Sequence, residues 1–246
     1  MKGKQQDEII IGTRPLEEAI MANKSIDKVW FQKGLKNEIV IRIRKLLADR
    51  KIIYQDVPLQ KLNKITRKNH QGVIAFISPI SFHDIEEVVM ASFEKGKSPF
   101  ILILDRVTDV RNFGAIVRSA EFFGVDAIVV PSRGGARVNF DSIKTSAGAI
   151  FNVPICKADN LYRTIKHLKA SGLKVVSLTE KGSRNIRGCN FSAPLAIIVG
   201  SEEDGVSSDL LKISDELLKI EKIGNTDSLN VSVACSIALF HFNQSE

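Results

Sequence analysis

Short apolar runs alternate with stretches of helical spacing in the N-terminal third of the chain. From Glu8 to Pro79 the apolar runs are EIIIG, DKVWFQ, KIIYQD and GVIAFISP. Between them lie segments whose apolar positions recur every three or four residues, such as RPLEEAIMAN, NEIVIRIRKLLADR and PLQKLNKIT. This pattern predicts a small α/β domain.

After Pro99 the pattern restarts with longer, continuous runs of Ile, Leu and Val: FILILD, DAIVV, KVVSLT, LAIIVG and ELLKIE. Helices are expected at 112–123, 161–170 and near Leu210, and a closing helix runs to Phe242. Continuous apolar strands alternating with helices are typical of a parallel sheet covered on both faces. Ligands bind at the carboxyl ends of such strands. We therefore expect chemistry in the loops after Asp105, Val130, Thr179, Gly200 and Ile220.

The stretch SFHDIEEVVMASFEKGKSP separates the two patterns. It has the spacing of an acidic amphipathic helix and ends in a Lys-Gly-Lys-Ser-Pro segment typical of a boundary. We expect an N-terminal domain at 1–80, a linker at 81–98 and a second α/β domain at 99–246.

The positive charge is concentrated at the N-terminal end. The chain of 246 residues has a net charge of +7; residues 1–79 hold 16 Lys and Arg against 8 Asp and Glu, whereas residues 99–246 hold 17 against 16. Such asymmetry indicates an anionic partner. The densest basic run consists of Arg42, Arg44, Lys45, Arg50, Lys51, Lys61, Lys64, Arg67 and Lys68. Each residue alone also fits a solvated helix face, but together they favour RNA.

Composition excludes several other classes. No run reaches the about 18 apolar residues of a membrane span, so we expect a cytoplasmic protein with no membrane partner. The three cysteines, Cys156, Cys189 and Cys235, form no C-x-x-C pair, and the four histidines show no ligand spacing. We expect reduced thiols and no metal. One tryptophan and two tyrosines offer few base-stacking platforms, which favours recognition of a structured RNA by shape and backbone.

Three loops in the second domain carry candidate chemistry. The first, LAIIVGSEEDGVSSDLL, has the glycine spacing of a P-loop, but Val206 stands where the Lys is needed, and Glu202, Glu203 and Asp204 would repel a polyphosphate. An acidic loop at a strand end suits a cationic or hydroxyl-bearing ligand; a plain solvated turn is the alternative.

The second loop, LDRVTDVRNFGAIVRSAEFFGV, leads into a helix. One of its faces carries Arg111, Gly114, Arg118 and Glu121 at i, i+3, i+7 and i+10. Glycine between two arginines permits close approach of a backbone or sugar phosphate. A surface ion pair between Arg118 and Glu121 is the alternative.

The third loop, NTDSLNVSVACSIALFHF, runs from small polar residues straight into an apolar helix. Ser228 or Asp227 is expected to cap this helix. One cap needs one oxygen, so the additional Thr226, Asn230 and Ser232 suggest that the polar groups also serve a ligand.

Together the three stretches resemble the three motifs of the SpoU or TrmH family of RNA ribose 2′-O-methyltransferases, in the family's order across residues 100–242. The N-terminal part, with IIIGTRPLEEAI and KITRKNHQGVIAFISP, looks like the ribosomal-protein-like RNA-binding domain of the rRNA-modifying branch. The departures are Val110-Arg111, where the family usually has Pro before the Asn, and Glu221-Lys222, where a Pro-Met pair is common. They put the detailed loop geometry in question.

The resemblance implies a fold, a cofactor and site residues. The fold is a parallel sheet with a trefoil knot, the cofactor S-adenosylmethionine, and the active site is completed across a homodimer. Carried over to this chain, the catalytic residues are Asn112, Arg118, Glu121, Glu202, Ser228 and Asn230. The cofactor would lie against Leu178, Gly200, Gly205, Ile220 and Leu229. The RNA contacts expected from the basic run, independently of the resemblance, are Arg42, Arg44, Lys45, Lys64, Arg67 and Lys68.

The expected reaction is methylation of a ribose hydroxyl, with a guanosine of large-subunit rRNA as the favoured target. An arginine is always charged at neutral pH, so we expect Arg118 to act as a fixed cation beside the developing alkoxide, oriented by Glu121, rather than as a base. The alternatives are a tRNA ribose methyltransferase, a non-catalytic RNA-binding or ribosome-assembly protein on the same scaffold, and a small-molecule α/β enzyme.

Overall fold

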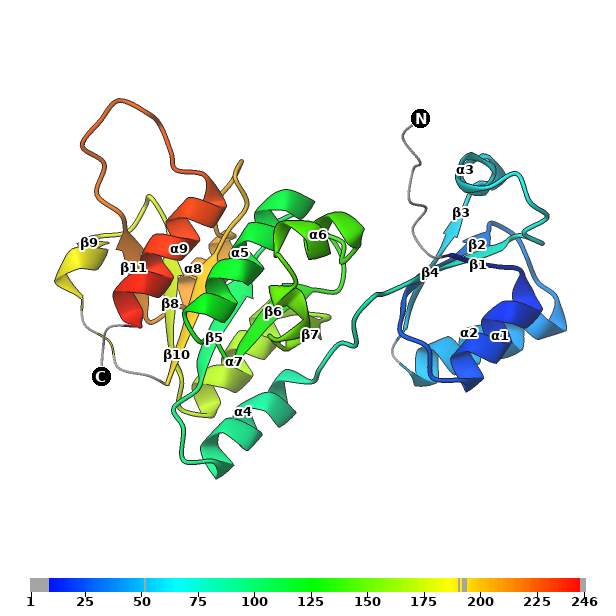
Figure 1. The fold of residues 1–246 in the computed structure, drawn as a ribbon, viewed down its shortest axis with the longest axis horizontal. Coiled ribbons are helices and arrows are strands. Elements are labelled where there is room, and N and C mark those ends of the chain that lie inside the picture. The colour runs from blue at the N-terminus through cyan, green and yellow to red at the C-terminus, as the bar shows by residue number, and fades with distance from the viewer. Residues whose placement is uncertain (1–8, 51, 190, 192–193, 244–246) are drawn as a thin grey trace. The chain divides into compact units, whose positions relative to one another are not determined.

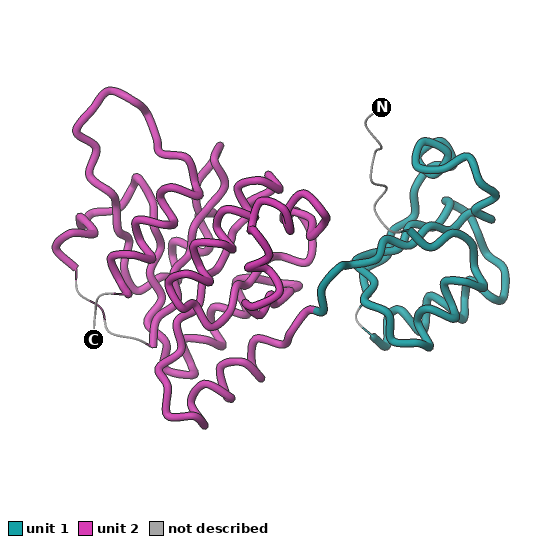
Figure 2. Tube along the Cα trace, in the orientation of Figure 1, with its two compact units in different colours: residues 1–81 teal, residues 82–246 magenta. Residues whose placement is uncertain are grey.

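The computed structural model describes residues 9–50, 52–189, 191 and 194–243, and the chain divides into two units at 81/82. Figure 2 shows the units in different colours. Lys51 of the basic run and the first part of the N-terminal segment lie outside the described residues. The expected linker at 81–98 contains α4 (Ile85–Glu94). Its Ile85 and Val89 are buried in the core of the second unit, so this helix belongs to that unit.

The first unit is a four-stranded mixed sheet in the order β1-β4-β2-β3. Its elements are β1 (Ile9–Ile11), α1 (Thr13–Met21), β2 (Ile26–Gln32), α2 (Glu38–Asp49), β3 (Ile53–Val57), α3 (Leu59–Ile65) and β4 (Val73–Ile77). Val73 and Ala75 face a core shared with α1 and α2, whereas Ile74 and Phe76 pack with Leu62 of α3. The alternation along β4 therefore places α3 on the face opposite α1 and α2 (Figure 1).

The second unit is a seven-stranded parallel sheet in the order β7-β6-β5-β10-β8-β11-β9. The strands are β5 (Phe100–Leu104), β6 (Ala127–Pro131), β7 (Ile155–Ala158), β8 (Lys174–Leu178), β9 (Arg184–Asn185), β10 (Leu195–Val199) and β11 (Glu216–Lys219). All five residues of β5 and of β10 are buried. The expected α/β class with a parallel sheet is confirmed.

Helices cover both faces of this sheet (Figure 1). The helical elements after α4 are α5 (Val110–Phe122), α6 (Phe140–Thr145), η1 (Ala149–Phe151), α7 (Leu161–Ala170), η2 (Ile186–Gly188), α8 (Ser208–Ile213) and α9 (Val231–Phe242). Helices α4, α7 and α8 share one buried cluster with the sheet, and α5 packs against α6 and α9. The helix predicted at 112–123 begins at Val110, because the Asp109 carboxylate accepts hydrogen bonds from the Arg111 and Asn112 amides.

The order of the last strands produces an unusual chain path. β11 lies between β8 and β9, two strands that come earlier in the chain. At Gly182, between those two strands, a side-chain carbon would come within 2.5 Å of the Leu218 carbonyl carbon in β11. The chain around residue 182 therefore crosses directly against the backbone of β11. Insertion of a late strand inside an earlier connection agrees with the knotted fold that the resemblance implied.

Gly114 lets another segment of the same chain come close to α5. A side-chain carbon there would meet the Thr145 side chain at 2.7 Å and the Ser142 carbonyl oxygen at 2.9 Å. The close approach that the glycine permits is thus made by α6 of the same chain. The expected close approach of a backbone is therefore confirmed, and α6 occupies the space that a sugar phosphate would have needed.

Gly114→Ala should therefore lower the free energy of unfolding by about 1 to 3 kcal/mol, the usual cost of overpacking a tight contact. Urea unfolding followed by circular dichroism measures this loss. Gly188→Ala is the matched control, because a side-chain carbon at Gly188 meets nothing within 4 Å. Equal stability of the two variants would contradict the packing of α5 on α6.

Candidate active site

Four neighbouring strands of the second unit end at the same level. Val199 of β10 is in register with Leu104 of β5 and with Leu178 of β8, and Leu178 is in register with Leu218 of β11. The loops that follow these strands therefore start side by side at one edge of the sheet. Ligands bind at this edge in parallel α/β sheets.

The loop after β10 folds into a closed turn. The amide of Ser201 donates to the Gly205 carbonyl at 3.2 Å, and the Gly205 amide donates back to the Ser201 carbonyl at 3.0 Å. A side-chain carbon on Gly200 would lie only 2.0 Å from the Gly205 carbonyl carbon. Position 200 therefore accepts glycine alone, and the turn holds Glu202 at its tip.

Glu202 joins the three loops. Its Oε1 accepts a hydrogen bond from Asn112 Nδ2 at 2.7 Å and from Asn230 Nδ2 at 2.7 Å. Asn230 Nδ2 also donates to Asn112 Oδ1 at 3.0 Å. Hydrogen bonds to an ionised carboxylate are about twice as strong as neutral ones. Asn112, Glu202 and Asn230, called the polar triangle below, thus connect the start of α5, the turn after β10 and the start of α9.

Asn230 also caps helix α9. Its Oδ1 accepts hydrogen bonds from the Ser232 amide at 2.9 Å and from the Ser232 hydroxyl at 2.5 Å, which makes Asn230 the N-cap of α9. The expectation that Ser228 or Asp227 caps this helix is wrong, because the helix begins two residues later than that reading placed it. One side chain therefore both starts the helix and reaches the other two loops.

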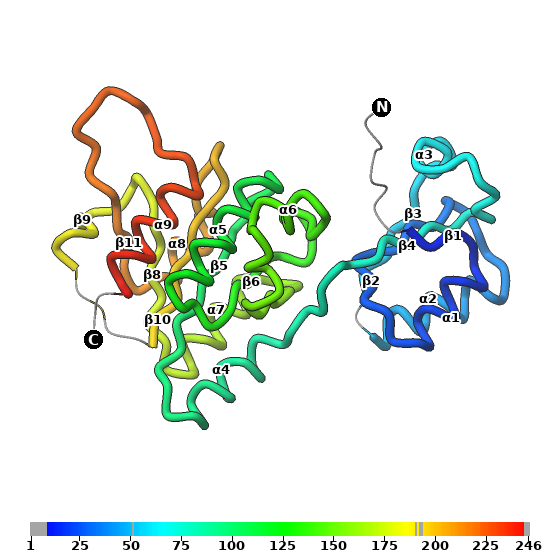
Figure 3. The backbone as a smooth tube through the Cα atoms, in the orientation of Figure 1, coloured from blue at the N-terminus to red at the C-terminus, as the bar shows by residue number. Residues whose placement is uncertain are grey.

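The remaining expected catalytic residues lie outside the polar triangle. Glu121 accepts a hydrogen bond from Asn152 Nδ2 at 3.4 Å, and Ser228 is exposed in the segment between β11 and α9. Figure 3 shows this segment as a long orange loop. In the part of the chain that the structure describes, the exposed Arg118 guanidinium forms no hydrogen bond or ion pair, so neither Glu121 nor the triangle orients it within one chain.

The expected cofactor residues lie at the same sheet edge. Leu178 ends β8, Gly200 follows β10, and Ile220 follows β11. Leu178 and Ile220 are half-buried and Leu229 is exposed. The edge therefore combines partly exposed apolar side chains with the Glu202 carboxylate.

The sequence analysis did not identify Asp105 and Arg106 as residues of this site. The buried Asp105 and the adjacent Arg106, at the end of β5, both contact the loop after β10. Asp105 and Arg106 directly follow one predicted strand, and three consecutive acidic residues follow another. This pattern could have indicated a contact between the two loops. Asp105 served in the sequence reading only to mark the end of the strand.

The six residues expected to contact RNA fall into two groups. On α2, Arg42 donates to both Glu17 carboxylate oxygens at 2.6 and 2.9 Å, and Arg44 pairs with Asp56 and covers the Phe31 ring. Lys45 on the same helix is exposed and, among the described residues, has no such partner. The α2 arginines are thus partly neutralised within the unit.

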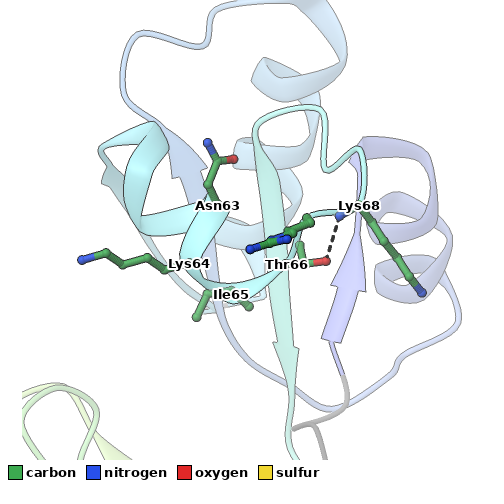
Figure 4. Close-up of a pocket in the computed structure, with 6 residues that line it drawn as sticks. Asn63, Lys64, Ile65, Thr66 and Lys68 are labelled. Atoms are coloured by element: carbon green, nitrogen blue, oxygen red, sulfur yellow. Dashed lines mark hydrogen bonds between the residues drawn. The ribbon is translucent and has the colours of Figure 1, made fainter.

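The second group consists of Lys64 in the last turn of α3 and of Arg67 and Lys68 on the segment that leads to β4, together called the basic loop below. It borders a depression of about 760 Å³ lined by Asn63, Lys64, Ile65, Thr66, Arg67 and Lys68. Figure 4 shows the Lys64 and Lys68 side chains extending away from the loop in different directions. Among the residues the structure describes, Lys64, Arg67 and Lys68 have no ion pair. This basic loop therefore carries uncompensated positive charge.

The buried His70 fixes the shape of the basic loop. Its Nδ1 accepts a hydrogen bond from the Gly72 amide at 3.0 Å, and its Nε2 lies 2.8 Å from Asn63 Oδ1. Because Nδ1 is an acceptor, the ring proton is on Nε2 and is donated to Asn63. The imidazole therefore ties the two ends of the loop together.

The described residues give no support for metal binding, membrane spanning or thiol catalysis. No group of three His, Cys, Asp or Glu there could hold a metal ion, and no helix has the length and apolar character needed to cross a membrane. The three cysteines are buried and free. Burial raises the pKa of Cys235 to about 12 and, with a contribution from Asp84, that of Cys156 to about 12. Neither thiol is therefore a nucleophile at neutral pH.

The sheet order and the three joined loops match the class that the motifs resemble, and comparison with known proteins agrees. The model of the SpoU rRNA Methylase family matches residues 99–240. A model for RNA 2′-O ribose methyltransferase substrate binding matches residues 9–83. The chain is 33% identical over 235 residues to a Staphylococcus haemolyticus protein assigned to the TrmH family of tRNA/rRNA methyltransferases, covering 96% of this chain and 94% of that protein.

Solved structures show the same fold. An AdoMet-bound rRNA methyltransferase from Sinorhizobium meliloti aligns with a TM-score of 0.60 at 24% identity, covering 95% of this chain and 85% of that one. The SpoU methyltransferase AviRb from Streptomyces viridochromogenes, in complex with AdoMet, aligns with a TM-score of 0.59 at 20% identity, covering 96% and 89%. The chain therefore belongs to the SpoU/TrmH family of RNA methyltransferases.

The two tasks of Asn230 can be separated by substitution. Asn230→Ser retains a capping oxygen, so the melting temperature should stay near that of the wild type. The serine cannot reach Glu202, and we expect methyl transfer to RNA to fall about 100-fold because the loops lose their alignment. Asn160→Ser, at the N-cap of α7, makes the same change away from the site. Full activity in Asn230→Ser would show that the polar triangle is not needed.

Proposed function

We propose that this protein methylates a ribose 2′-hydroxyl in structured RNA, with S-adenosylmethionine as donor and a guanosine of large-subunit rRNA as target. The polar triangle carries the proposal, because it gathers the three motif loops at the ligand-binding edge of the sheet. The two-unit layout supports an rRNA target. The names of the curated relatives include both tRNA and rRNA, so a tRNA ribose target is the alternative.

The residues at this edge fit the chemistry of the donor. S-adenosylmethionine combines an apolar adenine with a cationic sulfonium, and it supplies an electrophilic methyl group when bound. The half-buried Leu178 and Ile220 and the exposed Leu229 offer apolar surface. The Glu202 carboxylate supplies negative charge near it, whereas it would repel a polyphosphate. We assign the backbone around Gly200, Gly205, Ile220 and Leu229 to donor binding.

Arg118 would act on the ribose. Its guanidinium is permanently charged, has no partner among the described residues of its own chain, and is exposed. It can grip a phosphate through two N–H groups and stabilise negative charge on the hydroxyl oxygen as the new O–CH₃ bond forms. The hydroxyl proton leaves to phosphate or water. Ser228 would position the nucleotide, and Glu121 would orient Arg118. Both roles would require a bound second subunit or bound RNA.

An apolar surface beside Arg118 supports a homodimer. Phe122, 78% exposed, follows Arg118 by one helical turn on α5, and Phe240, 54% exposed, lies on the neighbouring α9. The two helices are joined by Ser119 and Ser236, whose hydroxyl oxygens are 2.7 Å apart. Exposed aromatic surface of this kind marks protein interfaces. A second subunit docked here would bring its own polar triangle toward Arg118 and complete the site.

The basic loop of the first unit is the better RNA surface. Its charges are uncompensated, whereas Arg42 and Arg44 are occupied by carboxylates. An open, basic depression fits the sugar-phosphate backbone of a structured RNA. Lys64, Arg67 and Lys68 are therefore the proposed main contacts of this unit, with Lys45 as a further candidate.

Arg118→Ala should abolish methyl transfer while S-adenosylmethionine binding, measured by calorimetry, is retained. The substrate would be ribosomal RNA from cells that lack the gene, with the methylated ribose located by primer extension. Arg163→Ala removes an exposed arginine of α7 that has no ion pair among the described residues, and it should remain active. Loss of both transfer and cofactor binding in Arg118→Ala would instead indicate a structural role.

Arg67→Ala and Lys68→Ala should each weaken RNA binding and reduce the slope of log affinity against log salt by about one. Filter binding across a salt series measures both effects. Arg42→Ala is the matched control, because its guanidinium is bound to Glu17. An equal change of slope in Arg42→Ala would contradict the preference for the basic loop, because α2 would then contact the RNA equally.

A further inference from the structure

Arg106 has a backbone conformation that few side chains adopt. It follows β5 with φ of +58°, in the left-handed region that favours glycine. Such conformations are strained for residues other than glycine and persist when the surrounding contacts hold them in place. A long, charged residue at this position therefore calls for a compensating set of contacts.

The Arg106 guanidinium makes those contacts with the loop after β10. Its Nη1 donates to Asp204 Oδ2 at 2.9 Å, and its Nη2 donates to the Gly205 carbonyl at 3.1 Å. Its Nε lies 3.4 Å from Asp105 Oδ1. The planar fork of an arginine can hold all of these acceptors at once, which a lysine cannot do.

Asp105 fastens the same loop at a third point. This carboxylate is only 4% exposed, and its Oδ2 accepts a hydrogen bond from the Ser207 amide at 2.7 Å. Arg106 and Asp105 together therefore bind Asp204, Gly205 and Ser207, three positions of the loop after β10. This set of contacts, called the clamp below, holds the end of the turn that begins at Gly200.

The positive charge of Arg106 offsets repulsion among the carboxylates of this turn. Three carboxylates, Glu202, Glu203 and Asp204, follow one another in a turn of six residues, and like charges at such spacing repel. Arg106 neutralises Asp204, the residue at the base of the turn. Glu202 is then left to point at Asn112 and Asn230, with which it forms the polar triangle.

We propose that Arg106 is a positioning residue of the methyltransferase site. It holds the Gly200–Gly205 turn in the form that presents Glu202 to the other two loops and the turn backbone to the donor. This inference rests on the proposed function, since it assigns the turn to S-adenosylmethionine. Arg106 acts through Asp204 and Gly205.

A purely stabilising role predicts a different result. The Arg106 side chain is 40% exposed and that of Asp204 is 68% exposed, and ion pairs at such exposure contribute little to stability. Loss of this ion pair alone would move the melting temperature slightly and leave cofactor affinity unchanged. A positioning role predicts an equally small change in melting temperature together with a large loss of cofactor affinity, so the affinity distinguishes the two roles.

The decisive variant is Arg106→Gly, because glycine adopts the positive φ without strain. We expect it to fold, to bind S-adenosylmethionine at least about tenfold more weakly in calorimetry, and to lose methyl transfer even at saturating donor. Affinity for RNA should not change. Arg106→Lys should recover part of the donor affinity, since an ammonium keeps the positive charge but lacks the wide planar fork that spans all three acceptors. Lys212→Ala, which removes an exposed ion pair with Asp209 on α8, is the control and should resemble the wild type.

Hydrogen exchange of the free protein separates this inference from the proposed function. The Gly205 and Ser207 amides, bound to the Ser201 carbonyl and to Asp105, should exchange at least about tenfold faster in Arg106→Gly than in Lys212→Ala. Wild-type exchange and wild-type donor affinity in Arg106→Gly would overturn the positioning role. If the wild-type protein binds no S-adenosylmethionine, the proposed function fails, and the exchange rates still decide whether Arg106 holds the turn.

Discussion

One carboxylate oxygen joins parts of the chain that are far apart in sequence. Glu202 Oε1 accepts both the Asn112 and the Asn230 amide groups, at 2.7 Å each, and the two amides also bond to each other. Without this junction, the start of α5, the turn after β10 and the start of α9 would be separate loops. Because Asn230 is also the cap of α9, the position of a helix depends on the same contact. The geometry of the site and the local structure are thus set together.

Close backbone packing underneath makes this junction possible. The parallel strands end level, and glycines at 182, 200 and 114 let neighbouring segments approach closer than any side chain would allow. β11 lies between β8 and β9, so the connection that contains Gly182 must close against it. The functional residues lie on loops, and these loops start from a rigid sheet. Contacts of Arg106 and Asp105 with the loop after β10 then limit how far the acidic Gly200–Gly205 turn can move.

Most of the fold could be predicted, and the failures have physical causes. Strands β5, β6, β8, β10 and β11 are continuous apolar runs and were recognised. β7, with Cys156 and Lys157, and the two-residue β9 have no such pattern and were missed. The short α6 was also not predicted, so the sequence left open whether a backbone or a sugar phosphate lies against Gly114. Ser228, Asp227 and Asn230 have equivalent capping chemistry, so local sequence could not say where α9 begins.

The site was predicted less completely, because its contacts span long separations. Motif resemblance selected Asn112, Glu202 and Asn230, and the structure brings these three together. Pairing of Arg42 with Glu17, or of Arg106 with Asp204, joins residues 25 and 98 positions apart and leaves no local signal. Arg118, Glu121 and Ser228 remain proposals, since within one chain they do not reach the triangle.

The most direct test is a crystal structure of the protein with S-adenosylhomocysteine. We expect the nucleoside to lie against Gly200, Ile220 and Leu229, both amides of the polar triangle to remain bonded to Glu202, and Arg118 of a second subunit to face the same space. A nucleoside bound elsewhere, or a Glu202 carboxylate turned away from Asn112 and Asn230, would disprove the proposed site.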